Sequence, residues 1–142
     1  MDIIPRILLL LLLIFFNGFF VAAEFALVSV RKSRIDELVL KGNKDARLVQ
    51  KALNNINSII SSTQLGITLV SLALGWLGEP AIAEFFERFF KFLPKDVALV
   101  SSHTIAITLA FILITFIDIT LGELTPKSIA LHRTEKVTLM LI

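Results

Sequence analysis

The chain of 142 residues contains no cysteine and only two histidines. The lack of cysteine excludes disulfide bonds, thiolate metal sites and thiol catalysis. Two histidines argue against a multi-histidine metal centre. Any metal ion that binds should therefore be held by oxygen ligands, which is the ligand type that hard cations prefer.

Charge is also scarce. Charged residues make up 18% of the chain and hydrophobic residues 56%, against about 25% and about 45–50% in ordinary soluble domains. The net charge of +2 is too small to indicate nucleic-acid binding, and no basic stripe interleaved with aromatic residues occurs. A domain this small cannot hide so much apolar surface from water. The composition therefore predicts an integral membrane protein.

The apolar residues gather in three long runs, at about 7–30, 57–78 and 98–121. Each run reaches the ~20 residues that a helix needs to cross the hydrocarbon core, and a helix is the open-chain structure that satisfies the backbone there. The sequence thus predicts an all-α membrane protein with three transmembrane helices. The first run could instead be a cleaved signal peptide, but the two later runs indicate a membrane protein either way.

The loops predict the orientation. Residues 31–51 carry seven basic and three acidic side chains, whereas residues 79–96 carry three basic and four acidic ones. The positive-inside rule then places the first loop in the cytoplasm. We expect a multi-pass protein of the cell membrane with its N-terminus outside and its C-terminus in the cytoplasm.

Short helices are expected outside the spans. Cytoplasmic helices are predicted at about 33–52, with a capping-box-like start at Ser33 and Asp36 and a stop at Gly42. Pro80 is suited to open an external interfacial helix over about 80–93, which has an apolar stripe and charged residues opposite. A cytoplasmic juxtamembrane segment is expected over 123–142, and the chain is expected to be part of a longer one.

Three carboxylates, Glu24, Asp118 and Glu123, lie in or at the ends of the spans. A charge at the bilayer centre costs about 2.5–3.5 kcal/mol on insertion scales, so it usually has a function. The alternative is that these acids reach the inner interface or stay neutral. Each span also carries a polar face, on which the main residues are Asn17 and Glu24, then Ser61, Gln64, Thr68 and Ser71, then Thr115, Asp118 and Gly122. Helix packing explains the small residues but not the acids.

The most specific motif is Gly122-Glu123-Leu124-Thr125-Pro126-Lys127. Pro126 has no amide hydrogen, so the carbonyl of Gly122 should lose its helical partner and the third helix should be broken here. A free carbonyl beside a carboxylate offers oxygen ligands to a hard cation. A proline that merely ends a helix would explain part of the motif.

Three motifs in register carry a resemblance to a known family. They are Asn17–Ala26 (NGFFVAAEFA), Gln64–Leu69 (QLGITL) and Gly122–Lys127. In this order and spacing they resemble the transmembrane domain of the CorC/cyclin M family, over nearly the whole chain.

The resemblance implies a homodimer that exports Mg²⁺ from the cytoplasm, with Na⁺ as the expected coupling ion. It implies that the transported metal ion binds within the membrane, at Gly122 and Glu123. Polar residues of the first two helices should complete the metal site, and the candidates are Asn17, Glu24, Gln64, Thr68 and Ser71. Full-length relatives continue into a pair of cytoplasmic CBS modules that bind adenine nucleotide, and this pair is expected to be absent from these residues.

Two other functions are alternatives to transport. The domain could be a non-transporting anchor and dimerisation module for CBS modules, although the intramembrane acids argue against that. An enzyme is not expected, since no Ser-His-Asp arrangement, His-Glu-x-x-His string or glycine-rich phosphate loop is present.

Overall fold

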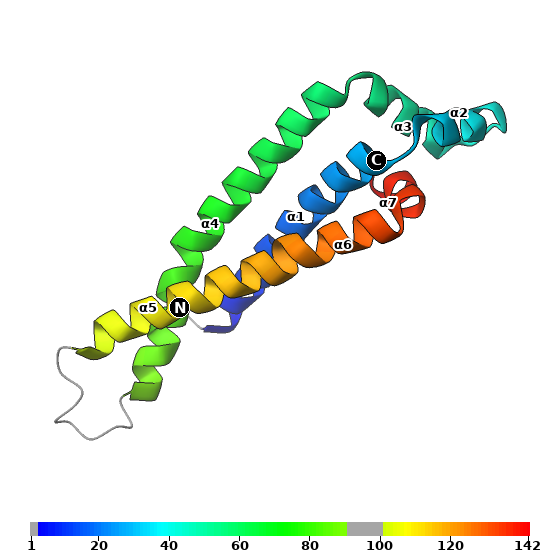
Figure 1. The fold of residues 1–142 in the computed structure, drawn as a ribbon. Helices are drawn as coiled ribbons and strands as arrows, with labels where there is room; N and C mark the ends of the chain where they lie inside the picture. The colour runs from blue at the N-terminus through cyan, green and yellow to red at the C-terminus, as the bar shows by residue number, and fades with distance from the viewer. Residues whose placement is uncertain (1–2, 91–100) are drawn as a thin grey trace.

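The computed structural model describes residues 3–90 and 101–142. Three long helical segments lie side by side, with a group of short helices at one end (Figure 1). The long segments are α1 (Ile3–Ser29), α4 (Ile56–Phe90) and a third that consists of α5 (Ser101–Ile117), the π-helix η1 (Asp118–Leu124) and α6 (Thr125–His132). The short helices are α2 (Lys32–Leu40), α3 (Lys44–Asn54) and α7 (Thr134–Leu141).

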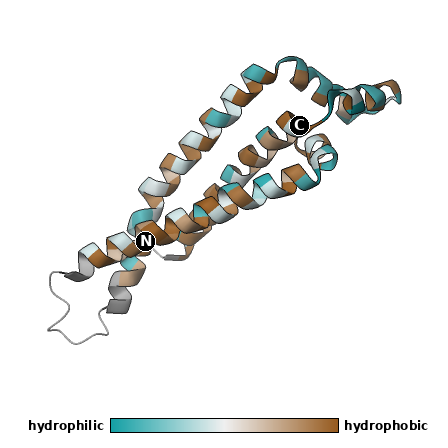
Figure 2. Cartoon of the chain, viewed as in Figure 1, coloured by the Kyte–Doolittle hydropathy of each residue, from teal (hydrophilic) through white to brown (hydrophobic). Residues whose placement is uncertain are grey.

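The prediction of an all-α membrane protein is confirmed. Three stretches are long and apolar enough to span a membrane, namely Ile4–Ser29, Ile56–Phe86 and Thr104–His132, and no strand occurs in the described ranges. Large apolar side chains on these stretches are exposed, among them Trp76 at 81% and Phe15 at 68%. Figure 2 shows the apolar colour along the long helices and the hydrophilic colour concentrated on α2 and α3. This distribution suits contact with lipid along the spans.

Helix α1 is central to the packing. It contacts α4, η1, α6 and α7, while α4 in turn contacts α5. Near the start of α1, Leu10 is buried against Leu74 and Ala81 of α4. Near its end, Leu27 is buried in a cluster with Ile35 of α2 and Val49 of α3. The polar residues Asn17 and Glu24 of α1 therefore lie between two apolar contacts.

The predicted start of a separate helix at Pro80 is wrong. Helix α4 continues through Pro80 to Phe90, and residues 91–93 of the predicted segment lie outside the described residues. A proline inside a helix removes its own amide donor. The helix persists because residues on both sides of Pro80 are fixed, since Leu74 and Ala81 pack in one cluster with Leu10.

Helices α2 and α3 form the connection between the first two spans. Helix α2 begins without a side-chain cap, so the predicted capping box at Ser33 and Asp36 is not formed. The predicted stop at Gly42 is confirmed: Gly42 has a φ of +84°, and the Asn43 amide donates to the Leu38 carbonyl over 3.0 Å. A positive φ of this kind favours glycine. The Asn43 side chain then caps α3 by accepting a 3.0 Å hydrogen bond from the Ala46 amide.

Ion pairs link α2 to α7. Arg34 donates to Glu135 at 3.0 Å and to Glu37 at 2.7 Å, and Lys41 is also paired with Glu37. The hydrogen bonds from Lys41 and Arg34 lower the pKa of Glu37 from its ordinary value. The hydrogen bonds that Arg34 donates to Glu135 and to Glu37 raise the pKa of Arg34 from its ordinary value. The ion pair between Arg34 and Glu135 therefore links the first loop to the last helix, α7.

Candidate ion-binding site

A polar cavity of about 380 Å³ lies among α1, α4 and η1. All three long helical segments contribute to its wall. The lining residues are Asn17, Val21, Glu24, Phe25, Gln64, Ile67, Thr68, Ser71, Asp118 and Glu123. The fold thus brings together six of the seven predicted site residues, and the seventh, Gly122, lies directly beside Asn17 and Asp118.

The third helix is not broken at the glycine–proline motif, contrary to the prediction. It stays helical but widens into the π-helix η1 just before the motif's proline. In this register the Thr125 amide donates to the Thr120 carbonyl, five residues earlier, and the Thr125 hydroxyl donates to the same carbonyl over 2.7 Å. These two bonds keep the backbone helical up to Pro126, which has no amide hydrogen of its own to donate. Single π-helical turns are frequent at functional sites.

Asn17 and Asp118 form a hydrogen bond between α1 and η1. The Asn17 Nδ2 donates to the Asp118 Oδ1 over 2.8 Å. Asn17 is only 3% exposed, and its Oδ1 is a buried atom without a hydrogen-bond partner. An unpaired buried acceptor costs about 1–3 kcal/mol. This oxygen is therefore suited to a ligand that can satisfy it.

Gly122 is buried against this pair. A Cβ atom at Gly122 would lie 2.5 Å from the Asp118 Oδ1 and 3.0 Å from the Asn17 Nδ2. Since the first distance is shorter than any van der Waals contact, a side chain at this position would displace the carboxylate. The close approach of the Asp118 and Asn17 side chains therefore requires glycine at position 122.

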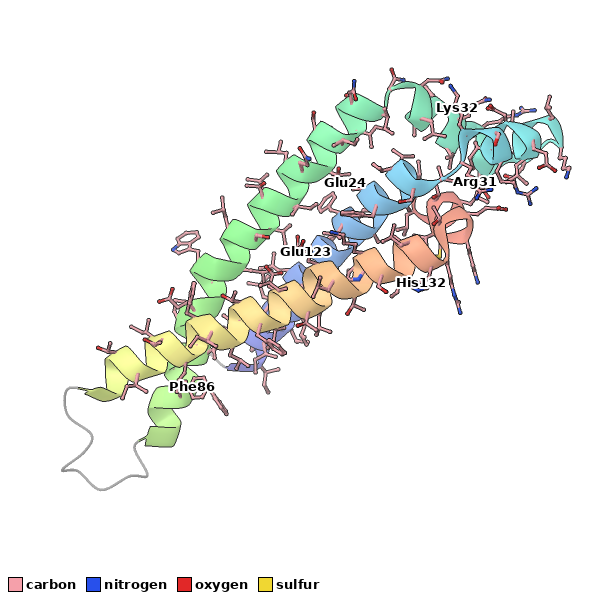
Figure 3. All side chains as sticks on the ribbon, viewed as in Figure 1. Glu24, Arg31, Lys32, Phe86, Glu123 and His132 are labelled. Carbon is pink, nitrogen blue, oxygen red and sulfur yellow. The ribbon has the colours of Figure 1, made fainter. Side chains whose placement is uncertain are left out.

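Glu24 has a partner on α4, because the Thr63 hydroxyl lies 3.0 Å from its Oε2. In Figure 3, Glu123 lies about midway along the bundle, and Glu24 lies nearer to the end where Arg31 and Lys32 are found. Gln64, Thr68 and Glu123 are exposed in the single chain, whereas Glu24 and Ser71 are half-buried. The Thr68 hydroxyl donates to the Gln64 carbonyl over 2.8 Å, so its lone pairs stay available to a cation.

Two residues that contact the predicted site residues are not in the predicted set. Asp118 lines the cavity and holds Asn17. The sequence places it on the polar face of the third span, but it is not among the predicted ligands. Thr63, 8% exposed, contacts Glu24. Its only sequence signal was its position beside Gln64 in a polar stretch.

A second cavity, of about 300 Å³, lies further along the bundle toward the start of α1. Apart from Asp118 its lining is apolar, with residues such as Leu10, Leu74 and Ile114. Asp118 thus lines both cavities. It marks the boundary between a polar and an apolar compartment.

The donor set of the polar cavity is mixed. In the ranges that the structure describes, no three Asp, Glu, His or Cys residues come close enough to form a metal-binding cluster. Carboxylates are instead combined with amide and hydroxyl oxygens. Mg²⁺ is usually held by one or two carboxylates while it keeps several waters, so this donor set fits a partly hydrated cation.

Comparison with known proteins agrees with this architecture. The family model described as the cyclin M transmembrane N-terminal domain matches residues 8–142. The chain belongs to this family. Similar relatives include the UPF0053 protein YhdT of Bacillus subtilis (strain 168), 43% identical over 99% of this chain, and YhdP of the same organism, 40% identical over 99%. The UPF0053 protein sll0260 of Synechocystis is 34% identical over 88% of the chain.

The cyclin M family assignment also indicates the class of function. It is a family of the membrane-transporter type rather than a catalytic one. The chain covers 30% of the length of YhdT and 31% of that of YhdP. The match therefore concerns the membrane domain.

Proposed function

We propose that this domain carries Mg²⁺ across the membrane, out of the cytoplasm and in exchange for Na⁺, with the polar cavity as its ion site. The observation that carries the proposal is the buried Oδ1 of Asn17, which has no hydrogen-bond partner, on a residue that lines a cavity to which three spans contribute oxygen-bearing side chains. Such a cavity within a membrane is costly unless an ion or water occupies it.

The cavity residues have distinct roles in this proposal. Glu123 supplies the main negative charge, and Glu24 adds to it from α1. The amide oxygens of Asn17 and Gln64 and the hydroxyls of Thr68 and Ser71 replace part of the hydration shell, together with the Gly122 carbonyl. Mg²⁺ dehydrates reluctantly. A cavity of about 380 Å³ has room for several of its waters, each of which occupies about 30 Å³ in the liquid.

The position of the cavity supports loading from the cytoplasm. Glu24 and Thr63, which are in contact, lie near the end of α1 and near the start of α4, beside the α2–α3 connection. That connection carries the basic excess of residues 31–51, which the positive-inside rule assigns to the cytoplasm. The site then belongs to the inner half of the membrane.

We also propose that the domain works as a homodimer in the bilayer. Gln64, Thr68 and Glu123 are exposed in the single chain although they lie on spans. A second copy beside the cavity would remove them from lipid. Nucleic acid has no role in this proposal, and adenine nucleotide would act only through CBS modules outside these residues.

The test is the thermal stability of the purified protein in detergent, with Mg²⁺ titrated at several Na⁺ concentrations. A ligand that binds only the folded state stabilises it by about 2.7 kcal/mol at a hundredfold excess over its Kd. We expect a saturable rise of the melting temperature with Mg²⁺, and its loss in Glu123→Ala. The matched control is Asp45→Ala, which removes an exposed carboxylate of α3 outside the cavity.

The same series separates transport from anchoring. If Mg²⁺ stabilises neither the parent nor the control, the cavity is no ion site and the domain is better described as an anchor. Direction and coupling are tested in vesicles loaded with Mg²⁺, where export requires external Na⁺. Mg²⁺ movement that ignores the Na⁺ gradient would overturn the exchange mechanism.

A further inference from the structure

We infer that Asp118 is a positioning residue, which orients the Asn17 amide so that its oxygen, and not its nitrogen, is free for the cation. This inference rests on the proposed function, because it concerns the same cavity. It assigns a role to the one intramembrane acid that the predicted site did not include.

The chemistry of the pair fixes the orientation of the amide. An ionised carboxylate only accepts hydrogen bonds, whereas an amide side chain donates through its nitrogen and accepts through its oxygen. An ionised Asp118 can therefore pair only with Nδ2, and the structure has this pairing, with a 2.8 Å bond from Nδ2 to the Asp118 Oδ1. The Asn17 Oδ1 must then point away from Asp118, and it is the atom that has no partner.

The backbone around the pair leaves little freedom. A Cβ at Gly18, the residue after Asn17, would lie 2.9 Å from the Pro126 Cγ, so α1 and α6 approach closely at this point. On η1, a Cβ at Gly122 would lie 2.5 Å from the Asp118 Oδ1. Two glycines thus bring the two side chains within hydrogen-bonding distance. Asn17 is 3% exposed, so its bond to Asp118 is shielded from bulk water.

This arrangement prepares an acceptor before the ion arrives. If Asp118 becomes asparagine, the new side chain can either accept from Nδ2 or donate to Oδ1, so both orientations of Asn17 become possible. One of them occupies the oxygen and presents hydrogens to the cation. Groups that orient a metal ligand typically account for 10–100-fold in affinity, so we expect Asp118→Asn to weaken Mg²⁺ binding about tenfold or more.

The experiment is a double-mutant cycle with the apparent Kd for Mg²⁺, from the ion-dependent melting temperature, as its readout. The variants are Asp118→Asn, Asn17→Ala and the double variant. Asp118→Asn also removes a charge, and that part of its effect persists when Asn17 is absent. Positioning adds a part that depends on Asn17, so Asp118→Asn should weaken binding more in the parent than in Asn17→Ala.

A swap provides rescue. In Asn17→Asp combined with Asp118→Asn, the asparagine donates to the aspartate, the charge of the pair is kept and one oxygen at position 17 stays free. We expect it to recover most of the affinity lost in Asp118→Asn. Equal losses from Asp118→Asn with and without Asn17 would overturn the inference, as would a swap that recovers nothing while its ion-free melting temperature matches the parent. If the parent itself binds no Mg²⁺, the proposed function fails instead.

Discussion

Gly122→Ala tests the close approach on which the site depends. Gly75→Ala is its matched control, because a Cβ at Gly75 would meet nothing within 4 Å. Both glycines lie inside helical segments of the spans, so each substitution gains about 0.5–1 kcal/mol from reduced backbone freedom. At Gly122 the added methyl group must also displace the Asp118 carboxylate, which would lie only 2.5 Å away.

The size of the effect follows from the bond that is lost. Breaking the bond between Asp118 and Asn17 leaves a buried donor unsatisfied, which costs about 1–3 kcal/mol. Measured side-chain hydrogen bonds in membrane proteins average about 0.6 kcal/mol, which sets the lower limit. We therefore expect Gly75→Ala to stabilise the protein slightly, and Gly122→Ala to be about 0.6–3 kcal/mol less stable than Gly75→Ala.

The assay is reversible unfolding in mixed detergent micelles without Mg²⁺, which gives the free energy of unfolding for each variant. The same two substitutions are then made in an Asp118→Ala background, where the carboxylate is missing and the difference should fall by at least half. If Gly122→Ala proves as stable as Gly75→Ala in the parent, the close approach is not real and the reasoning is refuted.

Three further results are expected. Gly66→Ala should destabilise the protein, since its Cβ would lie 2.9 Å from the Phe20 ring, and Phe20→Leu should relieve the effect; unfolding experiments on the single and double variants check this. The lowered pKa of Glu37 predicts stability that is present above the ordinary carboxyl pKa of about 4.3 and is lost as the pH falls through the lowered value. Melting curves from pH 6 to pH 3 should show this loss in the parent and less of it in Glu37→Gln. Because the chain has no cysteine, Lys44→Cys provides a single thiol, which a membrane-impermeant reagent should reach only from the cytoplasmic side.

Length and hydropathy predicted the class of fold correctly, and local chemistry predicted the stop at Gly42. The predictions that failed concern features that tertiary contacts determine. Pro80 looks like a helix start in the sequence, but the packing of Ala81 and Leu74 on Leu10 keeps α4 intact. A π-helix has no distinct composition, so Asp118–Leu124 could not be told from an ordinary turn.

The candidate site could likewise be predicted only in part. The polar types at Asn17, Glu24, Gln64 and Glu123 were recognisable because each is unusual in a membrane span. The partners of these residues were not. Asn17 and Asp118 are 101 positions apart, and their contact depends on the rotation of α1 against η1, which no local pattern encodes.

The two cavities that meet at Asp118 imply that the electrostatic profile along the bundle is asymmetric. A cation in the polar compartment has oxygen partners, whereas the apolar compartment offers it only the Asp118 carboxylate. A narrow apolar passage tends to stay free of water and so blocks ions without any side chain closing it. In the proposed transport, the apolar lining of the second cavity hinders a cation from leaving toward the start of α1. Release on that side therefore requires the helices to separate until water enters the apolar cavity. The transport rate should then depend on how readily this cavity becomes hydrated.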